Sequence, residues 1–472
     1  MARSEKDYQS PFSARYISPE MSYLFSAHYK ITTYRRLWIA LAKAQKQLGL
    51  KISAHQIDQM EAQIENIDFA KTNEYEKQFR HDVMAHIHAF GDLCPDAKPI
   101  LHLGATSSYV LDNADLIQLK AALQLLFHKL VHILKLLSSF AEKEASSPCL
   151  GYTHFQKAQP TTIGKRACLW IQDFLLDATE WERQIHSLPF LGAKGATGTQ
   201  ASFLSLFEGN FSKLQQMETT LSKEFGFSKV LPIAGQTYTR KIDLNLINAL
   251  ESFAASAHKM ATDIRLLAHE GELQETFGQA QVGSSAMPYK QNPIYAERIC
   301  GIARFVISLA QNPVYTTATQ WLERSLDDSS NRRLSIPETF LGVDALLNLL
   351  HHLLTHLIAD RQLSLDHLQE QIPFLAMENI LMKVVKKGGS RQAAHETLRQ
   401  IAISHKNKNA TASLLSEIER QLHLKPEEIS PLLDPAALIG AAPHQVHAYL
   451  KDEVHPFLSR HQTTTAFPPV DI

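Results

Sequence analysis

Apolar residues recur at alternating steps of three and four along residues 112–145. The alternation is unbroken at eight positions: Leu116, Leu119, Leu123, Leu126, Leu130, Ile133, Leu137 and Phe140. This spacing places them on one face of a helix over about four heptads. Leu125 and Val131 widen that face, which favours a bundle of several helices over a two-stranded coiled coil. Asp112 or Asn113 is placed to cap the start of the helix.

Four further stretches have helical periodicity: 161–185, 244–270, a stretch from 292 past 309, and 337–364. Helices of this length exceed the average of about 11–12 residues, so several in succession predict an elongated bundle. Strand patterns are scarce, and we therefore predict an all-α fold. Changes of pattern near Thr106 and Asp360 divide the chain into three predicted domains: residues 1–106, residues 107–359 with the long helices, and residues 360–472.

Two glycine-containing stretches interrupt the helices: GAKGATGTQ at 192–200 and GSSAMPYKQNP at 283–293, here called the GSS stretch. The first spaces its glycines every third residue and follows no strand, so it is not a dinucleotide loop. The GK of TTIGKRA lacks the earlier glycine of a phosphate loop. We therefore predict no cofactor.

The composition is typical of a soluble globular protein, and the formal net charge is −1. This balance excludes a general nucleic-acid or anionic-membrane surface, which needs a basic excess, but it allows a small pocket lined by arginine. The first residues contain no apolar signal segment, and no apolar run reaches the roughly 18 residues needed to span a membrane. We expect a soluble, cytoplasmic protein.

The cysteines and histidines do not form a metal-binding pattern. Four cysteines lie far apart without CxxC spacing: Cys94, Cys149, Cys168 and Cys300. They are expected to be free thiols in a reducing compartment. His81, His86 and His88 are not spaced by four, and His352 and His356 have that spacing without an acidic partner nearby. We predict no metal site.

Five polar clusters interrupt the apolar patterns: RHD at 80–82, GATSSY at 104–109, GYTHFQKAQPTT at 151–162, the GSS stretch, and RSLDDSSNRR at 324–333. Because they are far apart in the sequence, only folding or assembly could bring them together. Periodicity leaves two interpretations open. These residues either cap helices and form turns, as Ser, Thr and Asp often do, or they form a site.

The GSS stretch contains Ser284 and Ser285 without a GxSxG elbow, which disfavours an acyl-transfer nucleophile. Gly283 permits unusual backbone angles. Backbone N–H groups and Lys290 around a serine would stabilise its alkoxide and allow it to act as a base. Lys290 and Asn292 together could hold a carboxylate. The stretch therefore suggests chemistry on a carboxylate substrate.

His154 is the candidate partner of such a base. It lies in a predicted turn, where a structural role is the alternative. Glu297 follows the GSS stretch at the start of the next helix. If the two approach each other, the carboxylate would fix the imidazole tautomer and raise its proton affinity. His154 would then be a general acid.

The GSS stretch resembles the GSSxMPxKxNP loop of the fumarase/aspartase superfamily at every fixed position. A further set of motifs resembles the branch that acts on succinylated purine nucleotides: RHDVMAHIH, LHLGATSSYVLDNADL, GYTHFQKAQPTTIGKRACLWIQD, KGATGTQASFLSLFEG, GQTYTRK and RSLDDSSNRR. The resemblance runs from about Arg15 to the C-terminal region. It implies a three-domain all-α chain and a homotetramer whose long central helices form one core bundle. Each active site would draw on three subunits, and the apolar face of residues 112–145 would need such partners.

The implied reaction is elimination of fumarate in purine nucleotide biosynthesis, from adenylosuccinate to give AMP and from succinyl-aminoimidazole-carboxamide ribotide to give the free carboxamide ribotide. Ser284 is the implied base that removes the Cβ proton, and the choice over Ser285 rests on the resemblance. His154 is the implied acid that protonates the departing nitrogen. The implied catalytic set is His154, Ser284, Lys290, Glu297 and His81. Fixed donors must hold the dianionic intermediate.

The resemblance also implies the substrate-binding residues: Arg15, Tyr16, Arg80, His81, Asp82, Thr106, Ser107, Thr153, Gln236, Lys290, Asn292, Arg298, Arg324, Ser329 and Arg333. Arg324, Ser329 and Arg333 are expected to hold the 5′-phosphate, because a guanidinium matches phosphate oxygens. Sister enzymes such as argininosuccinate lyase, fumarase or aspartase share the GSS loop but lack a phosphate site. A non-catalytic relative is expected to have lost Ser284, His154 or Lys290.

Two residues depart from the superfamily pattern. Lys157 stands where proline is usual after the His154 turn, and Gln291 stands where arginine often follows Lys290. The first would alter the turn, and the second removes one positive charge from the loop. Neither removes a catalytic group.

Overall fold

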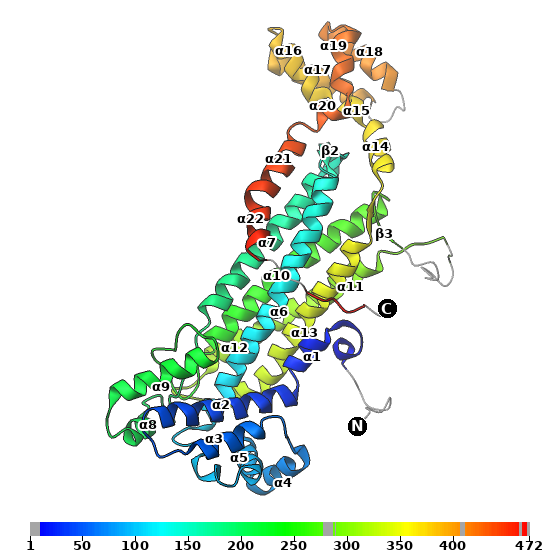
Figure 1. The fold of residues 1–472 in the computed structure, drawn as a ribbon. Coiled ribbons are helices and arrows are strands. Elements are labelled where there is room, and N and C mark those ends of the chain that lie inside the picture. The colour runs from blue at the N-terminus through cyan, green and yellow to red at the C-terminus, as the bar shows by residue number, and fades with distance from the viewer. Residues whose placement is uncertain (1–9, 277–286, 288, 406–410, 462–464, 470–472) are drawn as a thin grey trace.

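The computed structural model describes residues 10–276, 287, 289–405, 411–461 and 465–469. The molecule is elongated and helical (Figure 1). Five long helices form its centre: α6 (Ser107–Lys143), α7 (Ile163–Ser187), α10 (Lys241–His269), α11 (Ile294–Leu309) and α13 (Asp327–Thr355). α6 packs against α7 and α13, and α10 packs against α7, α11 and α13. The predicted all-α fold with a bundle of long helices is confirmed.

The apolar face of α6 is covered within a single chain. Of the eight periodic positions from Leu116 to Phe140, seven are at most 2% exposed, and Phe140 is half-buried. The expectation that this face needs partner chains is therefore wrong, because α2, α7 and α13 of the same chain pack against α6. One window of α6 has mean hydropathy 1.3, enough by length and composition to cross a membrane, but 61% of that window is buried inside the molecule. This is the character of a core helix.

The start of α6 also differs from its prediction. The helix begins at Ser107, with Thr106 at the N-cap position. Asp112 and Asn113 lie inside the helix and are buried. Asp112 pairs with Arg240, while Asn113 bonds the backbone of residues 191 and 192. Their side chains bind partners on other segments of the chain, so the prediction that either residue caps the helix is wrong.

The N-terminal region lies at one end of the bundle and supplies an arm along it. Its elements are the π-helix η1 (Phe12–Tyr16), α1 (Pro19–Leu24), α2 (Ala27–Gln47), α3 (Ala54–Ala62), α4 (Phe69–Phe79), α5 (Asp82–Leu93) and the 3-10 helix η2 (Lys98–Ile100). α2 packs on α6, and η1 packs on α13. α8 (Ala201–Leu206), α9 (Phe211–Glu224) and α12 (Gln311–Thr319) complete this end of the molecule (Figure 1).

The C-terminal region projects from the other end (Figure 1). It comprises α14 (Arg361–Gln369), α15 (Ile372–Leu375), α16 (Met377–Lys386), α17 (Arg391–His405), α18 (Thr411–Leu422), α19 (Pro426–Ile429), η3 (Ser430–Leu433) and α20 (Pro435–Leu438). Residues between Ala376 and Ile429 form a hydrophobic core of their own. α21 (Ala442–Tyr449), the π-helix η4 (Leu450–Val454) and α22 (His455–Arg460) then return to the bundle.

The limits of the three predicted domains stay predictions. Apolar contacts nevertheless join the end of the third predicted domain, residues 360–472, to the long helices of the second. Val446, Leu450, Val454 and Phe457 are buried in the same core as the long helices. Residues 442–460 therefore pack as part of the bundle.

Within the described ranges, two small antiparallel sheets accompany the helices. β1 (Pro148–Thr153) pairs with β2 (Gln156–Thr162), and β3 (Leu273–Glu275) pairs with β4 (Leu357–Ala359).

The last predicted helix, 337–364, is shifted. α13 begins at Asp327 and ends at Thr355, and Pro337 lies inside it. Asp327 and Asp328 in its first turn suit the positive end of the helix dipole, which is why the polar RSLDDSSNRR cluster is largely helical.

Candidate active site

A cavity of about 470 Å³ lies where the starts of α5, α6 and α13 meet. Six of the predicted site residues line it: His81, Asp82, Ser107, Arg324, Ser329 and Arg333. They come from three of the five polar clusters, which are separated in the sequence by up to about 250 residues. Folding of one chain therefore assembles part of the predicted site.

The two arginines of the cavity are held differently. The Arg324 guanidinium donates to the side-chain oxygen of Gln236 and, at 3.3 Å, to Ser108 Oγ. Arg333 Nη2 lies 3.8 Å from Asp82 Oδ2, and its side chain is 61% exposed. Arg324 is thus fixed by neutral partners, and Arg333 keeps most of its fork open to solvent. Two cations facing one carboxylate suit the binding of an anion such as a phosphate.

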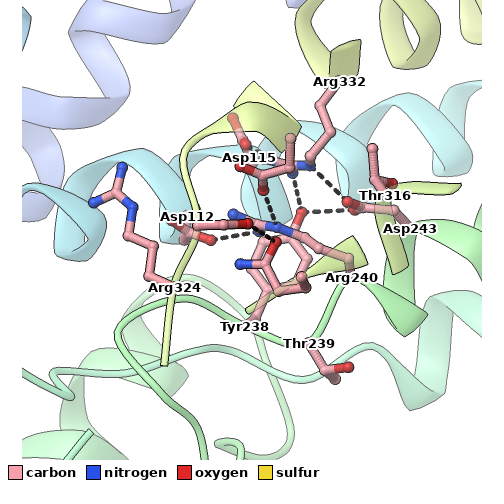
Figure 2. Close-up of polar contacts among 12 residues, drawn as sticks. Asp112, Asp115, Tyr238, Thr239, Arg240, Asp243, Thr316, Arg324 and Arg332 are labelled. Carbon is pink, nitrogen blue, oxygen red and sulfur yellow. Dashed lines mark hydrogen bonds and ion pairs between the residues drawn. The ribbon is translucent and has the colours of Figure 1, made fainter. Parts of the chain in front are cut away.

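Beside the cavity lies a buried ionic network that joins α6, α10 and α13 (Figure 2). Arg240 contacts Asp112 and Asp328, each at 2.6 Å. Arg332 contacts Asp243 at 2.7 Å and Asp115 at 3.0 Å. The Tyr238 hydroxyl donates to Asp243 Oδ1 at 2.7 Å. Figure 2 shows Arg324 pointing away from these contacts.

The network fixes the cavity residues because its members are their neighbours. Asp328 immediately precedes Ser329, and Arg332 immediately precedes Arg333. Burial raises the pKa of the Asp112 carboxyl, an effect that the Arg240 and Arg332 charges oppose. A buried charge of this kind is tolerated only when it is paired.

Sequence reasoning missed this role. The sequence patterns predict Asp112 or Asn113 as a helix cap, and they leave the polar cluster at 324–333 as caps and turns or as part of a site. The signal in the sequence that could have indicated the network is the presence of acidic residues beside the apolar face of α6.

His154 lies at the opposite end of the bundle from the cavity. It forms the two-residue turn between β1 and β2 with Phe155, and both have positive φ angles, 52° and 56°. This is the geometry of a tight hairpin turn that normally favours Asn and Gly. Thr153, His154 and Gln156 are all exposed. Lys157 pairs across the hairpin with Tyr152, so the ladder forms with lysine at this position.

The GSS stretch lies in part outside the described residues, including Ser284 and Ser285. Lys290 is described and exposed, and Asn292 is half-buried. The start of α11 is held by Glu275 of β3, whose two carboxylate oxygens accept the backbone N–H groups of Tyr295 and Ala296 at 3.0 and 2.9 Å. Glu275 thus joins the two chain segments on either side of the stretch.

Two other predicted residues lie near the start of α11. Arg298 is half-buried, and its Nη1 atom is buried without a hydrogen-bond partner among the described residues. Glu297 is exposed, and within the described part of one chain no hydrogen bond or ion pair joins it to His154. The proposed His154–Glu297 contact stays a prediction.

The remaining predicted residues occupy further positions. Arg80 ends α4 in a left-handed conformation, with φ 52°. Thr106 caps α6 by position, without a side-chain hydrogen bond. Arg15 and Tyr16 end η1, which packs on α13. Among the described residues, no group of three or more His, Cys, Asp or Glu side chains is placed to hold a metal ion.

The length of the helices separates the two ends. α6 has 37 residues, so Ser107 and the hairpin after Lys143 are about 55 Å apart. α10 has 29 residues, so its end at His269 is about 43 Å from Arg240; β3 follows this end and is bonded to the start of α11, four residues after Lys290. One chain therefore cannot bring His154 or Lys290 to its own cavity.

The family profile described as "Lyase" matches residues 20–308, and the profile described as "Adenylosuccinate lyase C-terminus" matches residues 373–449. Adenylosuccinate lyase of Saccharomyces cerevisiae is 45% identical over 458 residues, covering 95% of each chain. That of Schizosaccharomyces pombe is 43% identical over 476 residues, covering 98% of each. That of Pyrococcus horikoshii is 30% identical, covering 92% of this chain and 95% of the relative.

Solved structures share the fold. A 3-carboxy-cis,cis-muconate lactonizing enzyme from Pseudomonas putida superposes with TM-score 0.81 at 23% identity, covering 96% of this chain and all of the other. A fumarate lyase from Mesorhizobium sp. BNC1 superposes with TM-score 0.79 at 23% identity, covering 95% of this chain and all of the other. At such identities the likeness concerns the fold. With the two profile matches and the full-length relatives, the chain belongs to the adenylosuccinate lyase family of carbon–nitrogen lyases, within the fumarase/aspartase superfamily.

Proposed function

We propose that the protein releases fumarate from two substrates of purine nucleotide biosynthesis: adenylosuccinate, giving AMP, and succinyl-aminoimidazole-carboxamide ribotide, giving the free carboxamide ribotide. The observation that carries the proposal is the cavity lined by Arg324, Ser329 and Arg333. Arginine forks suit a 5′-phosphate, which both substrates carry and argininosuccinate lacks. The full-length relatives named adenylosuccinate lyase support the same substrate class.

The reaction breaks the bond between the succinyl carbon and the nucleotide nitrogen. In our proposal Ser284 removes a proton from the succinyl Cβ, and the electron pair passes to the adjacent carboxylate as an aci-carboxylate dianion. Lys290 and Asn292 stabilise that charge. The pair then forms the double bond of fumarate as the C–N bond breaks, and His154 protonates the departing nitrogen. Glu297 orients His154, and His81 orients the substrate. No cofactor takes part in these steps.

We further propose that the active site forms between copies of the chain in a homotetramer. His154 and Lys290 lie at one end of the bundle and the cavity at the other, so a second copy must supply the missing end. The exposed apolar side chains of Leu176 on α7, Phe305 on α11 and Leu334 on α13 offer surfaces for this contact. Four buried free thiols suit a reducing cytoplasm, which we propose as the compartment.

The decisive assay follows adenylosuccinate by ultraviolet absorbance, with fumarate release from argininosuccinate measured in parallel. We expect activity on adenylosuccinate alone. Activity on argininosuccinate alone would replace the proposal with the sister enzyme. A folded protein inactive on both substrates would indicate a non-catalytic relative.

A further inference from the structure

The N-terminal arm, residues 10–18, carries Arg15 and Tyr16 and lies beside the bundle next to α13 (Figure 1). Arg15 is exposed, and Tyr16 is half-buried. The apolar attachment of the arm is Phe12, whose ring lies 5.6 Å from that of Phe305. The ring also packs on α13 at Gly342, where a Cβ would lie 3.6 Å from it, an ordinary van der Waals distance. Tyr16 is a second apolar attachment, because it packs against the core of the long helices.

Beneath the arm lies a charged pair that is fully buried. Lys129 of α6 and Asp344 of α13 each have no exposed surface and form an ion pair. Asn348, one turn after Asp344, accepts a hydrogen bond from Lys129 Nζ at 2.9 Å. We call Lys129, Asp344 and Asn348 the buried triad. It takes no part in the network beside the cavity or in the chemistry proposed above.

The arm binds the triad through its backbone. Asp344 Oδ2 accepts the N–H of Ser18 at 2.6 Å and the hydroxyl of Ser18 at 2.9 Å. The amide of Asn348 donates to the carbonyl oxygen of Tyr16 at 2.8 Å. The triad thereby fixes the chain on the C-terminal side of Arg15 and Tyr16, at the backbone itself.

The chemistry of the triad favours this role over one in bundle stability. Burying an ion pair carries a desolvation penalty, and well-packed apolar residues often stabilise a core as well or better. Apolar residues here would leave the Ser18 N–H and the Tyr16 carbonyl buried without partners, which is unfavourable. The charged pair is what allows an irregular segment to dock on two long helices.

We propose that Lys129, Asp344 and Asn348 are positioning residues that orient the arm and so set the affinity for the nucleotide. This rests on the proposed function and on the sequence-based expectation that Arg15 and Tyr16 bind the substrate. None of the three touches the substrate. Their effect passes through the arm, so their loss raises KM and leaves kcat near its wild-type value.

The test uses Asn348→Leu in the full-length protein, because it removes the bond to Tyr16 without leaving a charge unpaired. Hydrogen exchange measures the amides of the arm, and kinetics with adenylosuccinate measure KM and kcat. We expect the Ser18 amide to exchange about tenfold faster and KM to rise roughly 5- to 30-fold. Thr339→Val is the matched control, because Thr339 is buried on α13 and, among the described residues, its hydroxyl bonds only the carbonyl of Ser335 in its own helix. It should change neither quantity.

A double-mutant cycle separates positioning from a general structural effect. In an Arg15→Ala background, Asn348→Leu should raise KM much less than it does alone, because the contact that it orients is already missing. Additive effects, an unchanged Ser18 exchange rate, or an equal KM rise in Thr339→Val would each overturn the proposal. If Asn348→Leu does not fold, Ser18→Ala removes the hydroxyl bond from the arm side and should shift both quantities the same way by less.

An assay of the wild-type protein distinguishes failure of the proposed function from failure of the positioning role. If that protein does not cleave adenylosuccinate, the substrate assignment fails, and with it the role of the triad in affinity. The exchange rate of the Ser18 amide in Asn348→Leu still decides whether the triad orders the arm.

Discussion

The two ends of the long bundle present their candidate site residues in opposite ways. At the cavity end, Ser329 and Arg333 adjoin residues of a buried ionic network that spans three helices. At the hairpin end, His154 is exposed in a turn where two non-glycine residues have positive φ angles. The cavity end is built within one chain, whereas the hairpin end points its residues outward. The difference is what the proposed site between copies of the chain requires of His154.

Loss of activity tests the hairpin end most directly. His154→Ala and Ser284→Ala should each lower kcat by about 10²- to 10⁴-fold, the size expected for a lost general acid or base. The melting temperature of His154→Ala should stay unchanged, because the side chain is exposed. If Ser284→Ala keeps near-full activity and Ser285→Ala does not, the base is the second serine.

Mixing these two inactive variants tests whether His154 and Ser284 reach one site from different chains. Subunit exchange should restore part of the activity, since some sites would then combine an intact His154 with an intact Ser284. No recovery after verified exchange would show that both residues reach a site from the same chain and would count against their being shared between copies.

Stability tests the cavity end. Arg240→Met leaves Asp112 and Asp328 buried without their partner and should lower the free energy of unfolding by about 3–5 kcal/mol. Urea unfolding at a fixed protein concentration measures the change. Arg399→Ala is the control, because it breaks an exposed pair with Glu396 and should not shift the midpoint. Equal effects of the two variants would show that the network does not stabilise this end.

The cavity end should also be sensitive to acid. Burial, with a contribution from His81, lowers the pKa of His102 from 6.5 to about 4. The Trp38 indole N–H donates to His102 Nδ1 at 2.9 Å, which requires that nitrogen to be unprotonated. Since the folded state favours neutral His102, its contribution to stability is complete above pH 6.5 and is lost as pH falls toward 4.

Unfolding midpoints at several pH values between 7 and 4 measure this loss. His102→Gln can still accept the Trp38 bond and should flatten the profile. An unchanged slope in that variant would exclude His102 as the cause.

The smallest expected effect concerns backbone strain in the hairpin. Phe155→Gly removes the side chain that disfavours φ 56° and should stabilise the turn by about 1 kcal/mol. Slower hydrogen exchange of β1 and β2 amides would report it. Gln159→Gly, in the same hairpin but inside β2, should act in the opposite direction. Faster exchange in Phe155→Gly would mean that Phe155 holds the turn through side-chain contacts.

The periodic stretches were predicted well because a long helix has to bury a repeating apolar face. The prediction for α6 located its apolar face, yet it required other chains to cover residues that the chain covers itself. It also assigned Asp112 wrongly as a possible helix cap. An acidic residue beside an apolar face can either cap a helix or form a buried ion pair. Only the position of Arg240, 128 residues later, distinguishes the two.

The residues around the candidate site also fall into those that the sequence predicts and those that only the structure reveals. The residues of the proposed substrate site could be predicted from local motifs, and folding places six of them around one cavity. The role of the buried triad could not be proposed, because Lys129 and Asp344 are 215 residues apart and nothing local marks either of them.

The sequence by itself determined the long helices, the family and the chemistry that its motifs suggest, because these depend on spacing within short segments. Tertiary structure decided which charges are buried partners, which end of the bundle each functional group occupies, and how the arm with Arg15 docks. Those features depend on contacts between segments far apart in the chain, and burial makes an unpaired charge unfavourable wherever such a contact is missing.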